Sequence, residues 1–328
     1  MTACPSCGES VPPTARYCEA CGAELTPDIA APSPAAAAGG PAGCASCGAP
    51  ASQIGEDGYC GQCGMKQPAP GDHRELELSA IAAVTDRGLH HHRNEDAFAI
   101  AEVDVGDFTA LVVVVCDGVS STSDSDLAAQ GAAIAACDTL RAAVTRDPTA
   151  LAARTVDAVA AAQAAASRVP AKDGETPSST IVTAIAVRTA ERATVVVGWL
   201  GDSRVYCIVD GTLRQVSVDD SWAADQIAAG MAEATAYADP QSHTITRWLG
   251  ADAVDVVPTV ETLEIPLGST LLVCSDGLWN YAPTVGALAS VIAERQPASS
   301  NLALAQSLTN FARTAGGHDN ITVAIASI

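Results

Sequence analysis

Residues 111–121 read LVVVVCDGVSS, an uninterrupted apolar run that ends on an aspartate and a glycine. A second stretch, LLVCSDGLWNY at 271–281, has the same form. Short apolar runs rich in β-branched residues are typical of strands. The two runs therefore predict two strands that aim their terminal acids, Asp117 and Asp276, at one place.

The chain from about Glu75 onward contains further segments of this kind. With the two runs above included as 108–116 and 271–277, strands are predicted at 76–84, 108–116, 179–187, 193–201, 271–277 and 321–328, with a hairpin over 204–216 that turns at Asp210-Gly211. Ala-rich helices are predicted at 125–144 and 148–169, and a late helix at 301–315. Because the helices come in pairs rather than alternating with strands, the pattern favours an α+β layered domain over a parallel βαβ sheet.

Composition narrows the classes of partner. The 328 residues are 48% hydrophobic but only 4% aromatic, so Ala, Val, Leu and Ile must fill the core. Lys and Arg total 17 against 38 Asp and Glu, a formal charge of −21. This balance argues against nucleic acid and against an anionic membrane surface, since both are bound by clustered basic residues. Most of the carboxylates are expected to serve solubility, and a few to bind cations.

No targeting or membrane segment is recognisable. No apolar run approaches the ~18 residues that a bilayer span needs. The first ten residues, MTACPSCGES, have neither a charged start nor an apolar stretch and do not resemble a signal peptide. We therefore expect a cytoplasmic protein, in which thiols stay reduced.

Eight of the 12 cysteines lie in the first 63 residues, always as C-x-x-C followed by glycine. They form two repeats: Cys4, Cys7, Cys18 and Cys21, then Cys44, Cys47, Cys60 and Cys63. The predicted organisation is a zinc ribbon at 1–25, a Pro/Ala/Gly linker at 26–43, a second ribbon at 44–65, a linker at 66–75 and one domain at 76–328.

Two C-x-x-C turns can supply four thiolates in the tetrahedron that Zn²⁺ prefers. Segments this short cannot build a core, so the metal would supply the folding energy. Disulfides or a redox C-x-x-C are the alternatives, which the expected location and the repetition weaken. Nucleic-acid binding by the ribbons is disfavoured because Arg16 and Lys66 are their only basic residues. The remaining cysteines are predicted to be core residues: Cys116, Cys137, Cys207 and Cys274.

Acidic motifs recur at the predicted strand edges. They are RNEDAF (93–98), CDGVSS (116–121), GWLGDSRVY (198–206), SDGLWN (275–280) and GGHDNITV (316–323). A single acid at a strand end is usually a turn former or a helix cap. Several together, without an adjacent Lys or Arg, favour a site for Mg²⁺ or Mn²⁺, which prefer oxygen ligands and keep several waters.

The ordered set of motifs resembles the type 2C metal-dependent serine/threonine protein phosphatases, the PPM family, in their bacterial branch. RGLHHHRNEDAF, VVCDGVSS, GDSRVY, HTITRWLG, LLVCSDGLW and GGHDNITV carry the resemblance, over about residues 77–328. It implies a four-layer αββα sandwich, in which two antiparallel sheets are flanked by helix pairs. The cysteine repeats resemble the double zinc ribbons of bacterial regulatory proteins, which implies protein interaction and two structural Zn²⁺.

The resemblance also implies a site with two Mn²⁺ or Mg²⁺ ions. Asp117 would bridge both metals and the Gly118 carbonyl would bind the second. Asp276 and Asp319 would hold the first metal, and Asn320 would order the loop around Asp319. The remaining implied ligands are Glu95 and Asp96 on the second metal, directly or through water, and Asp202 at a third, weaker site.

The implied reaction is hydrolysis of phosphoserine and phosphothreonine in proteins. Two cations lower the pKa of a water between them, and the resulting hydroxide attacks phosphorus in line. The metals offset the charge of the phosphoryl oxygens, so no covalent enzyme intermediate is needed. Candidate partners are phosphorylated proteins, a Ser/Thr kinase or its targets, and a protein bound by the ribbons.

The sequence departs from the family pattern in three places. His91 stands where the family commonly has a phosphate-binding Arg, so either His91 contacts phosphate with help from Arg93, or the HHH run (90–92) is only a polar loop. Val119 replaces a His that some members carry. Asn280 replaces the Asp that usually completes the third metal site, which puts that ion in doubt. The main alternative to an active phosphatase is a catalytically weak or inactive phosphatase-like scaffold that binds phosphoproteins.

Overall fold

The computed structural model describes residues 2–3, 10–11, 43–44, 47–55, 57–119, 124–142, 144–172 and 174–328. The four cysteines of the first predicted ribbon, Cys4, Cys7, Cys18 and Cys21, and the predicted linker up to residue 42 lie outside these ranges. Near the N-terminus, β1 (Thr2–Ala3) and β2 (Ser10–Val11) form a short antiparallel pair. The second cysteine segment contains one short 3₁₀ helix, η1 (Ala51–Gln53).

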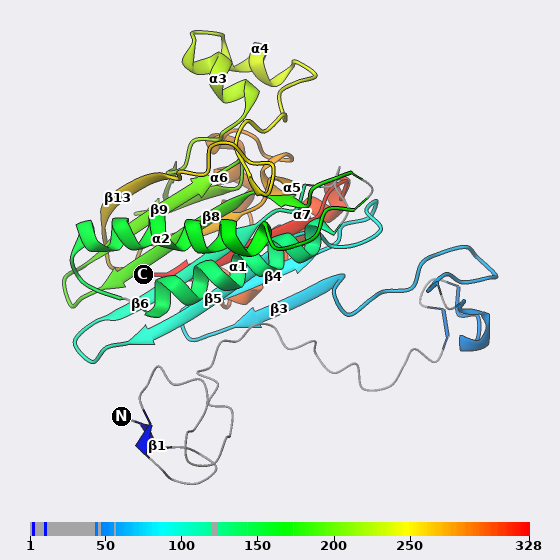
Figure 1. The fold of residues 1–328 in the computed structure, drawn as a ribbon, viewed down its shortest axis with the longest axis horizontal. Coiled ribbons are helices and arrows are strands. Elements are labelled where there is room, and N and C mark those ends of the chain that lie inside the picture. Colours follow the sequence, from blue (N-terminus) through cyan, green and yellow to red (C-terminus); the bar gives the residue numbers. More distant parts are fainter. Residues whose placement is uncertain are drawn as a thin grey trace.

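Two antiparallel sheets form the main body, as Figure 1 shows. The six-stranded sheet has the order β11-β10-β14-β15-β4-β3, and its strands are β3 (His73–Glu77), β4 (Ile81–Asp86), β10 (Arg204–Val209), β11 (Thr212–Gln215), β14 (Thr270–Cys274) and β15 (Ile321–Ser327). The five-stranded sheet has the order β13-β9-β8-β6-β5, and its strands are β5 (Ala97–Asp104), β6 (Thr109–Cys116), β8 (Ile181–Arg188), β9 (Arg192–Leu200) and β13 (Thr259–Pro266). A separate pair joins β7 (Ser178–Ser179) to β12 (Leu249–Gly250). The predicted antiparallel sheets with flanking helices are confirmed.

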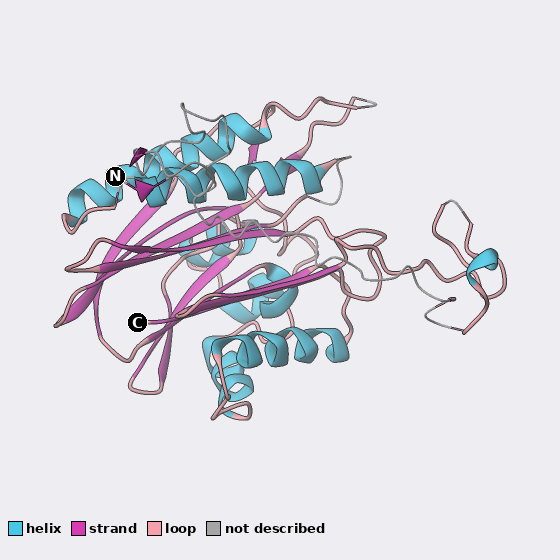
Figure 2. Ribbon diagram, turned by 90° about the horizontal axis from the view of Figure 1, so that it is seen from below, coloured by secondary structure: helices cyan, strands magenta, loops and turns pink. Residues whose placement is uncertain are grey.

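Helices lie outside the two sheets, which face each other between them (Figure 2). The outer face of the five-stranded sheet is packed against α1 (Ser125–Ala142) and α2 (Pro148–Ala166). The six-stranded sheet is packed against α5 (Asp276–Trp279), α6 (Val285–Ala293) and α7 (Asn301–Ala315). Two short helices, α3 (Trp222–Ala228) and α4 (Glu233–Tyr237), project at the edge of the molecule in Figure 1.

The apolar run in β6 is continuous because both faces of this strand are buried. Leu111, Val113 and Val115 point into the core between the two sheets. Val112, Val114 and Cys116 point the other way, into the core beneath α1 and α2. Successive side chains of a strand alternate between faces, so a central layer needs apolar residues at every position. The run ends at Asp117 because the chain leaves the core there.

The same alternation explains the second run. In β14, Leu271 and Val273 face the opposite sheet, whereas Leu272 and Cys274 face the helices. The strand ends at Cys274, and Asp276 begins α5, two residues before the predicted end of the strand at 277. All four cysteines predicted for the core are buried: Cys116, Cys137, Cys207 and Cys274.

Some predicted elements need correction. The single strand predicted over 76–84 is wrong, because this segment holds the end of β3 and most of β4, joined by a turn at 78–80. The sheet therefore begins at His73, inside the predicted linker. The sequence reading also omitted β5, β13 and α6. In the part of the chain that the structure describes, no helix is both long and apolar enough to cross a bilayer.

Candidate functional site

Loops from distant parts of the chain meet at one end of the two sheets, where the strands that precede or follow them end. The amide of Gly118 donates to the carbonyl of Glu95 at 3.1 Å, and the amide of Glu95 donates to Oδ1 of Asn320 at 2.7 Å. The amide of Ser275 donates to the carbonyl of Thr322 at 3.1 Å. These bonds join the segments that carry the predicted acids, so four separate motifs contribute to one site.

The acids at this site are buried or half-buried, and their like charges act on one another. Burial raises the pKa of Asp117 well above its usual value, and the nearby charges of Asp96, Asp276 and Asp319 raise it further. Burial, followed by the charge of Asp319, raises the pKa of Asp276 to about 7. Burial also raises the pKa of Asp96 to about 7, against hydrogen bonds that lower it. Desolvation and like charges both disfavour the ionised form, so the cluster favours an added positive charge.

Two buried oxygen atoms at the site, Asp96 Oδ1 and Asp276 Oδ1, have no hydrogen-bond partner among the described residues. The second oxygen of each carboxylate accepts a hydrogen bond. Asp96 Oδ2 accepts from Ser275 Oγ at 2.7 Å, and Asp276 Oδ2 accepts from Asn280 Nδ2 at 3.0 Å. An unpaired buried carboxylate oxygen is costly unless a cation binds it. These residues therefore fit hard divalent ions.

The spacing of the acids differs from that of a compact cage. Within the described ranges, only the second set of cysteines offers three or more ligand atoms that all lie within 4.8 Å of one another. The carboxylates are more widely spaced. Such spacing fits ions that keep several water molecules, as Mg²⁺ does.

Glycines allow the acidic loops to approach one another. A Cβ on Gly277 would lie 1.9 Å from the carbonyl oxygen of Asn320, and one on Gly118 would lie 2.6 Å from that of Glu95. Any other residue at either place would force the loops apart. The glycine in each Asp-Gly motif therefore serves close packing next to the acid that precedes it.

His91 lies against the acidic cluster. Its Nε2 is 3.2 Å from Asp319 Oδ1 and its Nδ1 is 3.7 Å from Glu95 Oε2. The carboxylate of Glu95 raises the pKa of His91, and burial opposes this effect. The structure thus brings His91 to the site. Its imidazole is held by acids rather than left in an isolated polar loop.

Arg93 and Glu95 are paired with each other. Arg93 Nε and Nη2 donate to Glu95 Oε1 at 3.0 and 2.9 Å, and Ser125 Oγ donates to the same oxygen at 2.6 Å. Asp124 and Asp126 lie 4.0 and 3.7 Å from the guanidinium. The charge of Arg93 is therefore already offset by three acids in this structure.

Asp202 and Asn280 both interact with Asp276. Burial raises the pKa of Asp202 well above its usual value, and the charges of Asp276 and Asp219 raise it further. The indole of Trp279 donates to the carbonyl of Asp202 at 2.9 Å. Asn280 donates its amide to Asp276, whereas the Asp found in the resembling family would repel it.

Sequence reasoning missed the hydroxyl residues that hold the acids. Ser275 and Ser125 hydrogen-bond Asp96 and Glu95, and the Thr180 hydroxyl accepts from the amide of Asp117 at 3.2 Å. Ser275 lies in the SDGLWN motif next to Asp276, so its position in the sequence could have indicated a role at the site. Nothing in the local sequence marks Ser125 or Thr180.

A buried ion pair was also missed. Arg204 donates to both carboxylate oxygens of Asp219, at 2.8 and 2.6 Å. It lies over the ring of Trp279, and donates to the hydroxyl of Tyr237 in α4 at 3.2 Å. The hydroxyl of Tyr237 is therefore held by the Arg204 guanidinium. The pair ties α4 to α5, which carries Asp276.

The second set of cysteines forms a compact cluster. The sulfur atoms of Cys44 and Cys63 are 3.6 Å apart, and those of Cys47 and Cys60 are 3.7 Å apart. These separations are too long for a disulfide bond of about 2 Å. A tetrahedron with Zn–S bonds of about 2.3 Å has edges of about 3.8 Å, so the geometry matches zinc.

Comparison with known families agrees with this geometry. Residues 88–313 match the model of the protein phosphatase 2C family, and residues 4–64 match that of the double zinc ribbon. The chain belongs to the protein phosphatase 2C family. The prediction of an enzyme of this family of serine/threonine protein phosphatases, carrying an N-terminal double zinc ribbon, is confirmed.

Individual phosphatases resemble most of the chain. The serine/threonine phosphatase stp of Listeria welshimeri is 28% identical over 245 residues, which cover 73% of this chain and 92% of stp. The crystal structure of the Mycobacterium tuberculosis serine/threonine phosphatase PstP/Ppp is 27% identical, with a TM-score of 0.59, over 76% of this chain and 97% of that one. The catalytic domain of PstP, solved with two manganese ions, is 25% identical, with a TM-score of 0.55, over 75% of this chain and 96% of that domain.

Proposed function

We propose that this chain is an active, metal-dependent phosphatase that hydrolyses phosphoserine and phosphothreonine in proteins. The observation that carries the proposal is the partly buried acidic cluster, in which the buried oxygens Asp96 Oδ1 and Asp276 Oδ1 have no hydrogen-bond partner among the described residues. Such a cluster is costly unless cations occupy it. The named serine/threonine phosphatases that resemble the chain support the substrate class.

The chain's own residues suit a site for two Mn²⁺ or Mg²⁺ ions. Asp117, Asp276 and Asp319 would hold one ion, and Asp117, the Gly118 carbonyl and Asp96 the other. Glu95 would act through water, because its Oε1 already accepts from Arg93 and Ser125. When bound, the two ions would lower the pKa of a water molecule and offset the charge of the phosphoryl group. Asp202 is the candidate for a third, weaker site.

The surrounding residues orient these ligands. Asn280 donates to one oxygen of Asp276, and Ser275 donates to one oxygen of Asp96. The other oxygen of each carboxylate is left to bind a metal ion. Asn320 holds the loop that carries Asp319, because its side chain bonds Glu95, Arg87 and Arg93 backbone atoms. His91 would donate a hydrogen bond to the substrate phosphate, next to Asp319.

The N-terminal segments would bind zinc and recruit a protein partner. Cys44, Cys47, Cys60 and Cys63 fit one Zn²⁺ by their spacing. The repeated sequence pattern extends the proposal to Cys4, Cys7, Cys18 and Cys21, which lie outside the described residues. The proposed organisation is two ribbons at 1–25 and 44–65 and a phosphatase domain, predicted at 76–328, that begins with β3 at His73. A kinase or its targets remain the proposed partners.

A Mn²⁺ titration of phosphopeptide hydrolysis, with the parent protein and Asp117→Asn, tests the proposal. We expect metal-dependent release of phosphate from the parent and a loss of at least ~100-fold in the variant. Thermal unfolding gives a second readout, since Mn²⁺ should raise the melting temperature of the parent more than that of the variant. Phosphopeptide binding without turnover in Mn²⁺ would contradict the proposal and favour a phosphoprotein-binding scaffold.

A further inference from the structure

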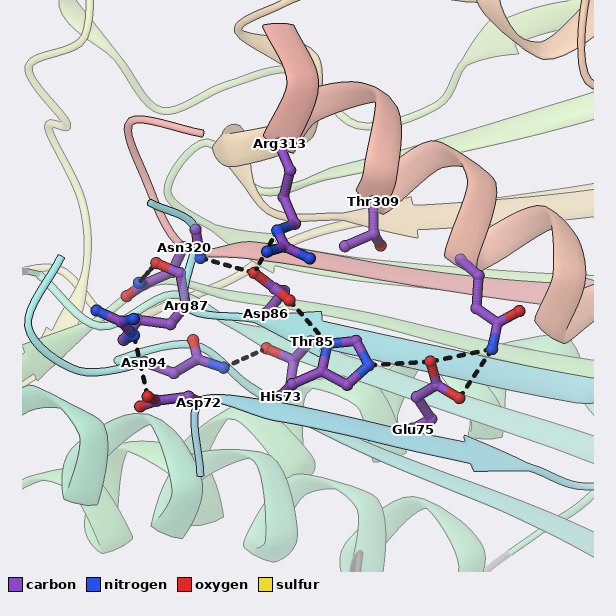
Figure 3. Close-up of polar contacts among 12 residues, drawn as sticks. Asp72, His73, Glu75, Thr85, Asp86, Arg87, Asn94, Thr309, Arg313 and Asn320 are labelled. Carbon is purple, nitrogen blue, oxygen red and sulfur yellow. Dashed lines mark hydrogen bonds and ion pairs between the residues drawn. The ribbon is translucent and has the colours of Figure 1, made fainter. Parts of the chain in front are cut away.

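The loop that carries His91 is held at both ends by the phosphatase body. At its start, the Arg87 carbonyl accepts from Asn320 Nδ2 at 2.9 Å, and at its end the Arg93 carbonyl accepts from the same nitrogen at 3.1 Å. Figure 3 shows Asn320 beside Arg87. The body also contacts the middle of the loop, because the amide of Leu89 donates to the Gly317 carbonyl at 2.7 Å and His90 stacks on His318. The backbone carbonyls of His91 and His92, at the far end of the loop, are bound by other groups.

The segment between the cysteines and β3 supplies part of this support. Arg87 Nε lies 3.1 Å from Asp72 Oδ2, as Figure 3 shows, and the Arg87 guanidinium donates to the carbonyl of His91. The side chain of Asn94 donates to the carbonyl of Gly71 at 3.4 Å. Residues 71–72, which were predicted to be a plain linker, thus contact the loop on either side of its histidines.

The second cysteine segment holds the next residue of the loop. Lys66 Nζ donates to the carbonyl of His92 at 2.6 Å, and the Tyr59 hydroxyl lies 3.4 Å from His92 Nδ1. Two cations, Arg87 and Lys66, therefore bind the consecutive carbonyls of His91 and His92. Hydrogen bonds that involve a charged donor are the stronger ones, so this pair restrains the loop backbone.

The cysteine cluster determines where these two side chains lie. Tyr59 and Lys66 are partners in an antiparallel bridge on either side of the Cys60–Gly64 turn. The turn is closed by the amide of Cys60 donating to the Met65 carbonyl at 2.9 Å. Gln67 Nε2 donates to the sulfur of Cys44 at 3.3 Å, which ties the following residue to the cluster as well. A metal that holds the four sulfurs would hold Tyr59 and Lys66 in place.

We propose that Tyr59 and Lys66 are positioning residues for His91, so that the zinc-folded second ribbon acts in cis on how the enzyme binds phosphorylated substrates. This role is distinct from partner recruitment, and it rests on the proposed contact of His91 with phosphate. The ribbon acts on His91 without touching the substrate or the acidic cluster, through its contacts with the carbonyl and the imidazole of His92, the next residue of the loop.

The test compares the full chain, loaded with zinc, with four variants outside the cysteine cluster and with Cys63→Ser. Lys66→Met removes the charged donor and Lys66→Arg keeps one. Tyr59→Phe removes the hydroxyl. Lys172→Met is the matched control, because Lys172 is the other lysine of the chain and is exposed after α2, outside this loop.

The first readout is amide hydrogen exchange over residues 88–94 without added Mn²⁺. We expect exchange about tenfold faster in Lys66→Met, a smaller increase in Tyr59→Phe, and parent rates in Lys66→Arg and Lys172→Met. Cys63→Ser, which removes a zinc ligand, should accelerate exchange as Lys66→Met does. Parent-like exchange in both Lys66→Met and Cys63→Ser would overturn the proposal.

The second readout separates KM from kcat with a phosphopeptide and Mn²⁺. Lys66→Met should raise KM about fivefold and change kcat less than about twofold, and Lys66→Arg should restore KM. An unchanged KM in Lys66→Met would contradict the positioning role. A parent protein without turnover would contradict the proposed function alone, because the exchange comparison does not depend on catalysis.

Discussion

His91 Nε2 lies 3.2 Å from Asp319 Oδ1, so an imidazole and a proposed metal ligand share one contact. The resembling family commonly has an arginine at this position. Histidine offers a single donor toward the site, whereas a guanidinium offers a planar fork that binds two oxygens of a phosphate. The substitution thus preserves a donor beside Asp319 while reducing the number of contacts that phosphate can make.

His91→Arg should bind phosphate more tightly than the parent. Since a bidentate guanidinium adds a second charge-assisted hydrogen bond, we expect the inhibition constant of inorganic phosphate to fall about tenfold. The measurement is phosphate inhibition of p-nitrophenyl phosphate hydrolysis in Mn²⁺. His90→Arg, on the neighbouring residue that stacks on His318, is the control and should leave the constant unchanged. An equal constant in His91→Arg and the parent would mean that this side chain does not reach phosphate.

Gly277→Ala should displace the loop that carries Asp276. Its new Cβ would lie 1.9 Å from the carbonyl oxygen of Asn320, and backbone on both sides leaves no flexible side chain to move aside. A displacement of about 1 Å at a reacting site can cost ~100-fold in rate, so we expect a loss of this size in kcat/KM.

Gly286→Ala is the matched control for that change. Gly286 lies in the first turn of α6, and a Cβ there would meet no atom within 4 Å. Alanine should stabilise this helix by ~0.5–1 kcal/mol and leave kcat/KM unchanged. Urea unfolding measures the first effect and phosphopeptide hydrolysis the second. Full activity in Gly277→Ala would show that the loops can separate without harm.

Arg204→Met should destabilise the protein strongly. The side chains of Arg204 and Asp219 are only 1% and 3% exposed, so removal of the guanidinium leaves a buried carboxylate without its partner. Breaking such a pair costs ~3–5 kcal/mol of unfolding free energy, which urea unfolding would measure.

An exposed ion pair in the same β10–β11 hairpin is the control for Arg204→Met. Arg214 in β11 lies 3.5 Å from Glu261, and both side chains are exposed. Arg214→Met should therefore cost less than ~1 kcal/mol. If both variants lost equal stability, burial would not be the reason for the strength of the Arg204–Asp219 pair.

His73 should make stability depend on pH. Its Nδ1 lies 2.7 Å from Asp86 Oδ2 and its Nε2 lies 2.9 Å from Glu75 Oε1, as Figure 3 shows. The hydrogen bond to Asp86 raises the pKa of His73, although burial opposes it, and Arg313 also faces Asp86. A raised folded-state pKa contributes stability that is fully present below the unfolded value of about 6.5 and is lost as pH rises through the folded value.

We therefore expect the urea concentration at the unfolding midpoint to decrease as the pH is raised from about 6 to about 8.5. The decrease should be smaller in His73→Gln. Gln306→Ala is the control, because Gln306 contacts Glu75 with an uncharged amide and removal of this contact should not alter the slope with pH. The same slope in His73→Gln and the parent would assign the pH dependence to other groups.

The sequence by itself determined the parts that depend on local pattern and on motif order. The apolar runs before Asp117 and Asp276 are readable because a strand buried on both faces needs apolar residues at every position. Their motif order was enough to predict the family. The turn between β3 and β4 was missed because its residues 78–80 carry no strong turn signal.

Only the tertiary structure decided which side chains hold the site together. Ser275 and Asp96 are joined by a hydrogen bond across 179 residues of sequence, and Arg204 meets Asp219 and Trp279 only through the packing of the hairpin, α4 and α5. The contact of Lys66 with His92 likewise depends on how the cysteine turn lies against a loop of another domain. Pattern within one segment predicts that segment's conformation, but the distance between two segments depends on every residue packed between them.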